Sequence, residues 1–350
     1  MGAARVLLTR AARVEGAPTV PSRWLLRLDA FLRCCGTGLP LLESGGDRTL
    51  ERNWARIVDR PAGAATPCAR PAPQPGAARR PDKLSVTQIE LWRRNPYAVY
   101  ARHILGLQAL DALDQDPGAA DLGTAIHDAL DAFVTRFPKT LPENALAELL
   151  AEGEQAFAEW LDRPSVWAFW QPRFRRIAAW WLEQEQERRP QLQEIRTELR
   201  GEWVVREVAP PFTLSARADR IDRKRDGSLA IIDYKTGEPP NDTEIALGFA
   251  PQLTLEAAMA AKGAFPKVPA ASVSELAHWR LTGSGEGGQV KLVRGDLPEL
   301  SRAAYDGLLA LLTHYGRDDA SYPASPDPGF APRFDDYAHL ARKAEWSSEL

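Results

Sequence analysis

The chain has 350 residues, of which 26% are charged and 44% are apolar, and its formal net charge is -3. This length suits one large domain with an appendage, or two domains, and the balanced charge argues against a protein that coats DNA through a strongly basic surface. Any binding of nucleic acid should therefore use local patches. No apolar run approaches the ~18 residues needed to cross a bilayer, so we expect no contact with a membrane.

The three cysteines, Cys34, Cys35 and Cys68, lie in the first fifth of the chain and lack the spacing of metal ligands. This pattern supports neither a disulfide framework nor a zinc site. We therefore expect a reducing, cytoplasmic location.

Residues 1–60 contain too little apolar pattern to bury a core of their own. ARVLLTRA is strand-like, and PSRWLLRLDAFLRC predicts an amphipathic helix capped by Ser22. Residues 61–82 are rich in Pro, Ala, Gly and Arg without periodicity, which is typical of an extended linker. We expect a domain boundary there, followed by one domain over residues 83–350.

From Lys83 onward, helices come first and strands follow. Helices are predicted in SVTQIELWRRNPYAVYARHIL, in TAIHDALDAFVTRF and in a Trp-rich region from Glu143 to about Arg189. The later segments are expected to be strands in RTELRGEWVVREV, FTLSARADRID and LAIIDYK, a helix in APQLTLEAAMAAKGAF, strands in SELAHWRL and QVKLVRG, and a last helix over 297–315. This order predicts an α/β fold around a mixed sheet.

The Trp-rich region allows two interpretations. Aromatic and basic side chains that alternate can stack the bases of single-stranded DNA, but such residues more often form a core between helices, which is the interpretation we favour. The tryptophans concerned are Trp160, Trp167, Trp170, Trp180 and Trp181.

An acidic hairpin is the strongest local signal. FTLSARADRID and LAIIDYK are separated by RKRDGS, and its Asp226-Gly227 pair predicts a turn between antiparallel strands. With the turn centred near Asp226, Asp219 should lie opposite Asp233. Because side chains alternate along a strand, Asp233 and Lys235 should point to one face and Tyr234 to the other.

Two opposed carboxylates repel each other, so the hairpin needs something that offsets the repulsion. The candidates are a shared proton, a nearby cation such as Lys235 or Arg217, and a bound divalent metal, for which Mg²⁺ is well suited because it prefers oxygen ligands. Solvated ion pairs are the simpler alternative. The apolar LAII before Asp233 favours a site, since it is typical of a central strand.

The motifs and their order resemble the PD-(D/E)xK nucleases, and more closely their RecB-type branch. The matching segments are GTAIHDAL with His127, ARADRID with Asp219, IIDYKTG with Asp233, Tyr234 and Lys235, and PQLTLEA with Gln252. The resemblance implies a restriction-endonuclease-like fold over 83–350, in which a mixed central sheet is flanked by helices, with a helical region N-terminal to it.

By this resemblance, the domain is a metal-dependent DNA nuclease, a phosphodiester hydrolase. Mg²⁺, or Mn²⁺ in its place, would be held by His127, Asp219, Asp233 and the main-chain carbonyl of Tyr234. Asp219, Asp233, Lys235 and Gln252 would form the catalytic set, with Lys235 serving the attacking water and Gln252 supporting the site from the following helix. Glu198, in the preceding strand, would add a more distant or water-mediated contact.

A lone histidine at the margin of an apolar helix stripe, as in TAIHDALDAFV, is more often a packed or surface residue. The nearby hairpin acids reverse that preference for His127. Three departures from the family pattern stand beside the match. Leu122 stands where relatives have Arg, Glu256 stands where Tyr is frequent, and no cysteine follows Cys68, so we expect no iron–sulfur cluster.

Further segments resemble the AddB family, the partner subunit of AddA in the alphaproteobacterial type of AddAB helicase–nuclease. They are LSVTQIELWRRNPYAVYARHILGL, YAHLARKAEW and RVLLTRAARVEGAPTVPSRWLLRL. This resemblance implies that 1–60 is a remnant of a helicase-like region and that the sequence is a fragment. It also implies exonuclease or endonuclease action on single-stranded ends of DNA unwound by AddA, in double-strand break repair by homologous recombination.

GxxxxGK[ST] is absent from the sequence, so we expect no nucleotide site. The alternative to an enzyme is a catalytically silent nuclease-like module that binds DNA or docks AddA. The presence of Asp219, Asp233 and Lys235 together favours the enzyme.

Overall fold

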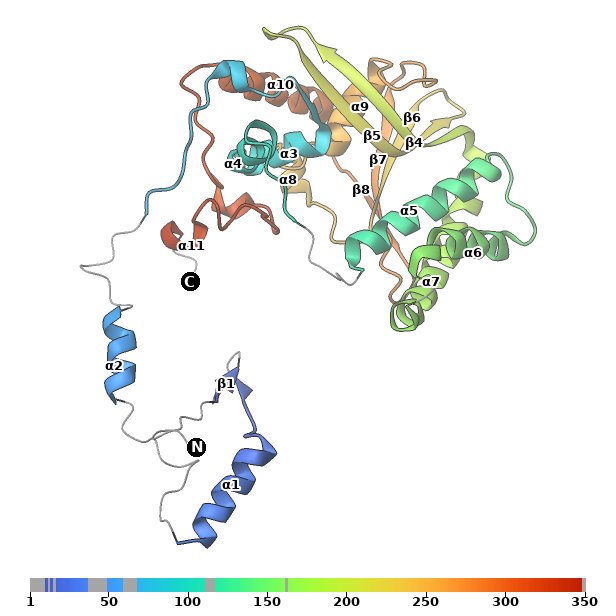
Figure 1. Ribbon diagram of the computed structural model, residues 1–350. Helices are drawn as coiled ribbons and strands as arrows, with labels where there is room; N and C mark the ends of the chain where they lie inside the picture. Colours follow the sequence, from blue (N-terminus) through green and yellow to red (C-terminus); the bar gives the residue numbers. More distant parts are fainter. Residues whose placement is uncertain are drawn as a thin grey trace. The chain divides into compact units, whose positions relative to one another are not determined.

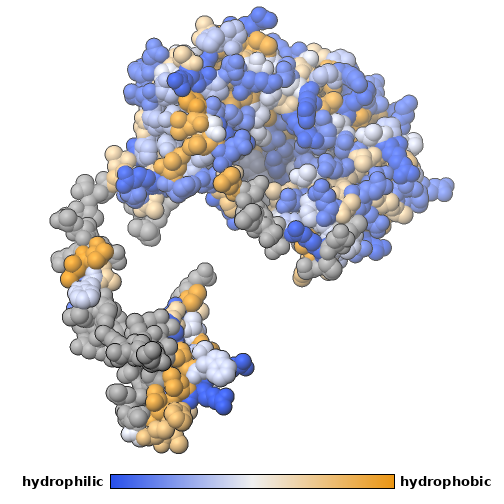
Figure 2. Space-filling view, in the orientation of Figure 1, coloured by the Kyte–Doolittle hydropathy of each residue, from blue (hydrophilic) through white to orange (hydrophobic). Residues whose placement is uncertain are grey.

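The computed structural model describes residues 10–11, 13–14, 17–36, 49–58, 68–110, 117–160 and 163–347, and the chain divides into two compact units, 1–66 and 67–350. The first unit contains β1 (Arg13–Val14), β2 (Ala17–Pro18), α1 (Arg23–Cys34) and α2 (Thr49–Val58). Most of the strand predicted in ARVLLTRA lies outside the described residues. The helix predicted after Ser22 is confirmed as α1, whose Leu25 N–H donates to Ser22 Oγ. Hydrophobic side chains of α1 are exposed (Figure 2).

The second unit contains most of the helices (Figure 1). Their bounds are α3 (Val86–Arg94), α4 (Pro96–Val99), α5 (Ala119–Arg136), α6 (Ala145–Ala156), α7 (Pro164–Arg188), α8 (Asp242–Ala246), α9 (Gln252–Ala261), α10 (Leu297–Tyr315) and α11 (Lys343–Trp346). A π-helical turn follows α4 at Tyr100–Ile104, and short 3-10 turns occur at Ala77–Arg79, Ala158–Trp160, Arg189–Gln191 and Pro328–Phe330.

A mixed sheet forms the centre of this unit. Its strands are β3 (Lys83–Ser85), β4 (Leu192–Val205), β5 (Phe212–Lys224), β6 (Leu229–Lys235), β7 (Val273–Arg280) and β8 (Gln289–Leu292). The order is β3-β5-β6-β7-β8, with β4 also paired to β5. The pairs β3–β5 and β6–β7 are parallel, whereas β4–β5, β5–β6 and β7–β8 are antiparallel. Of these strands, only the short β3 was not expected from the sequence.

Helices cover both faces of the sheet (Figure 1). One hydrophobic core joins the sheet to α3, α9 and α10, and another joins it to α5, α6 and α7. The predicted α/β architecture is therefore confirmed. Within the described part of the chain, no helix is both long and apolar enough to cross a membrane.

The Trp-rich region belongs mainly to the second core. Trp181 is 0% exposed and Trp180 is 8% exposed, while Trp160, Trp167 and Trp170 are partly buried against the same cluster. Losing a buried tryptophan costs about 3–5 kcal/mol. Packing therefore accounts for Trp180 and Trp181, and the other three tryptophans contact the same core.

The described part of the predicted 61–82 linker packs against the second unit. The carbonyls of Pro71 and Pro73 accept hydrogen bonds from the N–H groups of Ala324 and Tyr322, at 3.1 and 2.9 Å. Arg80 is 8% exposed and donates to the carbonyls of Leu312 and Pro210. Residues 71–80 thus form a strap on the domain rather than a solvated spacer.

Candidate active site

The acidic hairpin has the predicted register. Arg220 pairs with Ile232 and Asp222 with Ala230, and continuing this ladder by one residue places Asp219 opposite Asp233. The ladder stops just before that pair. There, Asp219 Oδ2 instead accepts the backbone N–H of Tyr234 at 2.7 Å.

Asp219 lies where β5 changes partners. On one edge β5 pairs with β4 over most of its length, and on the other edge it pairs first with β3, over Thr213–Ser215, and then with β6, from Arg220. The residues between these pairings, which end at Asp219, have no strand partner on that edge. The gap leaves room for side chains from other elements to reach the Asp219 carboxylate.

The alternation of side chains along β5 also shifts at this point. Leu214 and Ala218 belong to the core beneath α9 and α10, and so does Ile221, although period-two alternation would place it on the opposite face. Arg220 and Asp222 face the other side, where Arg220 bonds Glu185 of α7. The same shift in the facing of side chains occurs in β4, at the residue opposite Asp219.

Glu198 of β4 is the residue opposite Asp219, since its neighbours Thr197 and Leu199 pair with Arg220 and Ala218. Its φ of 52° lies in the left-handed region of the backbone, which residues other than glycine rarely adopt. Thr197, before it, donates to Asp131 of α5, whereas Leu199, after it, packs against the opposite core. The kink therefore brings the Glu198 carboxylate to the same place as Asp219.

His127 of α5 completes a group of potential metal ligands. Its Nδ1 lies 3.8 Å from Glu198 Oε1 and 3.6 Å from Asp219 Oδ1, and its Nε2 lies 3.1 Å from the carbonyl oxygen of Tyr234. One ligand atom from each of the three side chains falls within 4.8 Å of the others. An added Cβ on Gly123 would lie 3.4 Å from Thr236 Oγ1, at ordinary van der Waals distance, so this part of α5 packs beside the residue that follows β6.

A second group surrounds Asp233, which is 3% exposed. Its Oδ1 accepts from Lys235 Nζ at 2.9 Å and from Gln252 Nε2 at 2.7 Å, while Gln252 Oε1 also accepts from Lys235 at 3.1 Å. Its Oδ2 lies 2.9 Å from His278 Nδ1. Lys235 is thus the cation beside Asp233, and Arg217 pairs with Glu198 instead.

Tyr234 points to the opposite face from both neighbours, as the alternation predicts. Its side chain is 4% exposed and packs in the core with α5 and α7, where its hydroxyl accepts from Trp181 Nε1 at 3.2 Å. Its main chain, by contrast, belongs to the site through both its N–H and its carbonyl.

The pKa values of the two opposed carboxylates shift in opposite directions. Burial raises the pKa of Asp219, although the hydrogen bond from His127 opposes this effect. Burial also acts to raise the pKa of Asp233, but the charge of Lys235 and the hydrogen bond from His278 lower it overall. Burial acts to lower the pKa of Lys235, and the charge of Asp233 outweighs it, so that Lys235 remains an ammonium.

Glu256 adds a further buried acid. Burial and the nearby charges of Asp233 and Asp219 raise its pKa well above the ordinary value. It contacts the site through Gln252 Nε2 at 3.4 Å. The residue that departs from the family pattern is therefore a buried acid beside the site, and its surroundings disfavour its charged form.

The structure places the predicted residues in two adjoining groups. His127, Asp219 and the Tyr234 carbonyl come together with Glu198, and Asp233, Lys235 and Gln252 form the neighbouring group. Among the described residues, Asp233 is not part of the three-member cluster of potential metal ligands. Glu198 lies closer to the centre than expected, because its kinked backbone could not be read from the sequence.

His278 is the site residue that sequence reasoning missed. It stands between the apolar residues Ala277 and Trp279 in the strand SELAHWRL, which was the available signal. Its contact with Asp233 depends on the parallel register of β6 and β7, in which the two residues are partners. No local pattern fixes that register.

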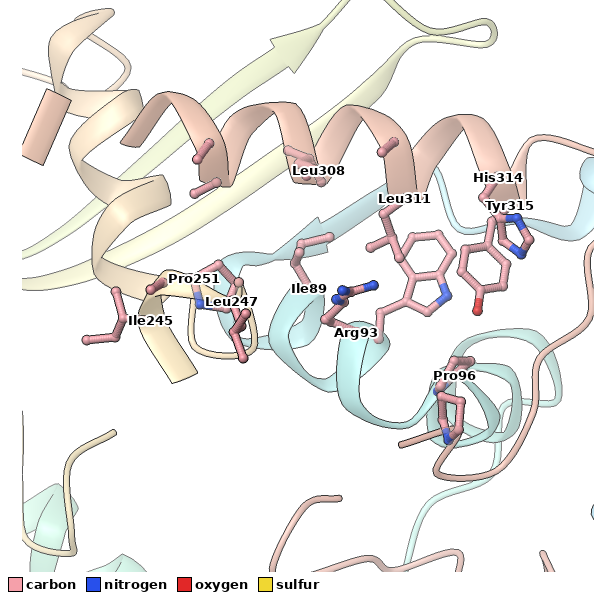
Figure 3. Close-up of a pocket in the computed structure, with 18 of the residues that line it drawn as sticks. Ile89, Arg93, Pro96, Ile245, Leu247, Pro251, Leu308, Leu311, His314 and Tyr315 are labelled. Carbon is pink, nitrogen blue, oxygen red and sulfur yellow. The ribbon is translucent and has the colours of Figure 1, made fainter. Parts of the chain in front are cut away.

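Two cavities of similar size differ in their relation to the site. One of about 510 Å³ is lined by Lys235, Gln252 and His278 on one side and by residues including Glu90 and Arg94 on the other. The other, of about 560 Å³, lies between α3, the α8–α9 turn and α10, and most of the residues that line it are apolar (Figure 3). None of the predicted site residues lines this second cavity, whereas Lys235 and Gln252 line the first, so the first adjoins the candidate site.

Comparison with known proteins extends these observations. The family model of the PD-(D/E)XK nuclease superfamily matches residues 83–329. A Rickettsia conorii protein named "Uncharacterized protein RC0550" is 32% identical over 205 residues, which are 57% of this chain and 24% of that protein. A Rickettsia felis protein named "Uncharacterized protein" is 28% identical over 270 residues, 75% of this chain and 30% of that protein.

The chain thus spans only about a quarter to a third of the length of these relatives. A solved structure titled "Crystal structure of SSO0001" is 12% identical, covers 66% of this chain and 77% of its own, and has a TM-score of 0.26.

Proposed function

Because the chain belongs to the PD-(D/E)XK nuclease superfamily, we propose that it is a divalent-metal-dependent nuclease that hydrolyses phosphodiester bonds of DNA. One observation carries the proposal. The cluster of His127, Glu198 and Asp219 lies directly beside the Asp233–Lys235 pair, joined to it through the main chain of Tyr234. Metal ligands and a cation for the phosphate are thus adjacent.

The donor set suits a hard divalent ion such as Mg²⁺ or Mn²⁺. Asp219, Glu198 and His127 would hold it, together with the Tyr234 carbonyl, which keeps a second lone pair beside its hydrogen bond from His127. Asp233 would join them through a lone pair that its present hydrogen bonds leave free. The bound ion would neutralise negative charge on the phosphate oxygens and favour attack by water.

The other residues act through position and charge. Since the pKa of Lys235 is raised, its ammonium is a hydrogen-bond donor rather than a base, and it would stabilise charge that develops on the phosphate or orient the attacking water. Gln252 fixes it there by accepting from Lys235 and donating to Asp233. The cavity beside Lys235 would allow the DNA strand to reach Lys235 and Gln252.

The finer proposal is an AddB-type subunit. Its support is the resemblance of several segments to that family and the greater length of the Rickettsia relatives, of which this chain matches only a part. In this proposal residues 1–60 are a remnant of a helicase-like region. The nuclease would then act in the cytoplasm on single-stranded ends of DNA unwound by AddA, during double-strand break repair.

A catalytically silent module is the competing function. One observation favours it: both oxygens of Asp233 already accept hydrogen bonds, and its side chain is almost fully buried. In such a module the Lys235–Asp233 ion pair would be the final state, and DNA or AddA would bind without cleavage.

Cleavage of single-stranded DNA in Mg²⁺ tests the proposal. Asp219→Asn and Lys235→Ala should each lower the rate at least about 100-fold, as is typical when a charge-stabilising group is removed, while Lys139→Ala, at an exposed residue outside the site, should cleave normally. Equal cleavage rates in all four proteins would contradict the proposal that this site is catalytic.

Thermal unfolding gives a second test. Mg²⁺ should raise the melting temperature of the parent but not that of Asp219→Asn. A rise in melting temperature without any cleavage would support the silent module.

A further inference from the structure

His278 occupies a defined place beside the proposed nuclease site. It lies in β7, two residues before the end of the strand, is 3% exposed, and is the parallel-register partner of Asp233. Its Nδ1 is 2.9 Å from Asp233 Oδ2. Since an ionised carboxylate can only accept, Nδ1 must carry the proton and donate it to this hydrogen bond.

The hydrogen bonds of Asp233 divide unequally between its two oxygens. Lys235 and Gln252 both donate to Oδ1, whereas His278 supplies the contact to Oδ2. The terminal torsion of an aspartate is broad and has no sharp preference of its own. Contacts at Oδ1 alone would therefore let the carboxylate plane rotate, and His278 is the residue that stops this rotation.

The direction of His278 also differs from that of its neighbours in the strand. Ala277 and Trp279 are buried in the core with α5 and α7, while His278 faces the side of α9 and lines the cavity beside Lys235. An apolar residue would fill a core position equally well. The imidazole is instead placed where its donor meets the one carboxylate oxygen that Lys235 and Gln252 leave free.

We propose that His278 is a positioning residue of the nuclease site, whose Nδ1–H fixes the plane of the Asp233 carboxylate and thereby directs its remaining lone pair toward the divalent ion. The inference rests on the proposed function, because it assigns Asp233 to that ion. Hydrogen-bonded partners of metal-binding side chains generally change metal affinity or activity by roughly 10- to 100-fold when they are removed.

Two substitutions separate the hydrogen bond from the packing of the ring. The amide nitrogen of Asn occupies the position of Nδ1, whereas that of Gln reaches toward the position of Nε2. His278→Asn should therefore keep the donor to Asp233, and His278→Gln should lose it. Both remove the ring, so a purely structural role predicts the same effect for both.

The measurement is the dissociation constant for Mn²⁺, determined by calorimetry on metal-free protein. His278→Gln should weaken binding about 10- to 100-fold, and His278→Asn should remain within about threefold of the parent. Equal affinities in Gln and Asn variants, whether both weak or both normal, would overturn the proposal. His314→Asn, on the exposed face of α10 and outside the site, serves as the matched control and should bind Mn²⁺ normally.

A second readout needs no metal. Nitrogen-15 NMR of the metal-free protein should show His278 protonated at Nδ1, and the Nε2–H tautomer would contradict the proposal. Asp233→Asn, measured in parallel with the parent and His278→Gln, separates a failure of the proposed function from a failure of the role of His278. If the parent neither binds Mn²⁺ nor cleaves, the proposed function fails. If the parent does both and Asp233→Asn leaves them unchanged, Asp233 does not hold the ion and the role of His278 fails with it. If Asp233→Asn abolishes them while His278→Gln binds normally, the role of His278 alone fails.

Discussion

His127 keeps its proton to a higher pH than an ordinary histidine. Burial by itself lowers its pKa, but hydrogen bonds and charges from Asp219 and Glu198 outweigh burial and raise the pKa to about 10. The ordinary value in the unfolded chain is about 6.5. A group whose pKa is raised by folding stabilises the native state fully below the unfolded value and loses this contribution as pH rises through the folded value.

In the absence of metal, the free energy of unfolding should therefore fall between about pH 6.5 and pH 10. His127→Gln removes the titrating group and should flatten this part of the profile, while Asp219 and Glu198 remain. Urea unfolding in EDTA at several pH values across this window measures the effect. If the free energy of unfolding fell equally with pH in the parent and in His127→Gln, His127 would not be the group that titrates in this window.

The kink in β4 connects the backbone of one strand to the geometry of the site. The hairpin, its turn and its register could be predicted because they depend on local sequence, namely alternating apolar residues and the Asp226-Gly227 pair. The shift of alternation at Glu198 could not be predicted, since it depends on a left-handed backbone in a residue that normally avoids it. The gap in β5 escaped prediction for a related reason, because it is set by β3, a distant segment of three residues.

This kink leads to a prediction about strain. A left-handed backbone costs a residue with a side chain roughly 1 kcal/mol or more relative to Gly. Glu198→Gly should therefore be more stable than Glu198→Ala by about 1 kcal/mol in metal-free protein, although both lose the carboxylate and should bind Mn²⁺ more weakly. Chemical denaturation compares the two variants directly. If Gly is the less stable of the two, the kink is not strained.

For the molecule as a whole, the sequence predicted the order of helices and strands and hence the two-faced α/β architecture. Two long-range features could not be predicted from the sequence: the contact of His278 with Asp233 and the packing of residues 71–80 against the domain. A stretch rich in Pro, Ala and Gly looks the same in sequence whether it is solvated or packed, because its main-chain carbonyls find their partners far along the chain. Here the partners of the Pro71 and Pro73 carbonyls are the N–H groups of Ala324 and Tyr322, more than 200 residues away.

The strap predicts where the stable domain begins. Chain 67–350 should keep the melting temperature of the second unit, whereas chain 83–350 loses Arg80 and the acceptors for the N–H groups of Tyr322 and Ala324. Since each buried polar group left without a partner costs about 1–3 kcal/mol, the shorter chain should be destabilised by roughly 2–4 kcal/mol. Thermal and urea unfolding of the two chains would reveal this difference, and Arg80→Met in the longer chain should reproduce part of it. Equal stability of both chains would mean that the strap contributes nothing and that the domain begins at the first helical residues after Lys83.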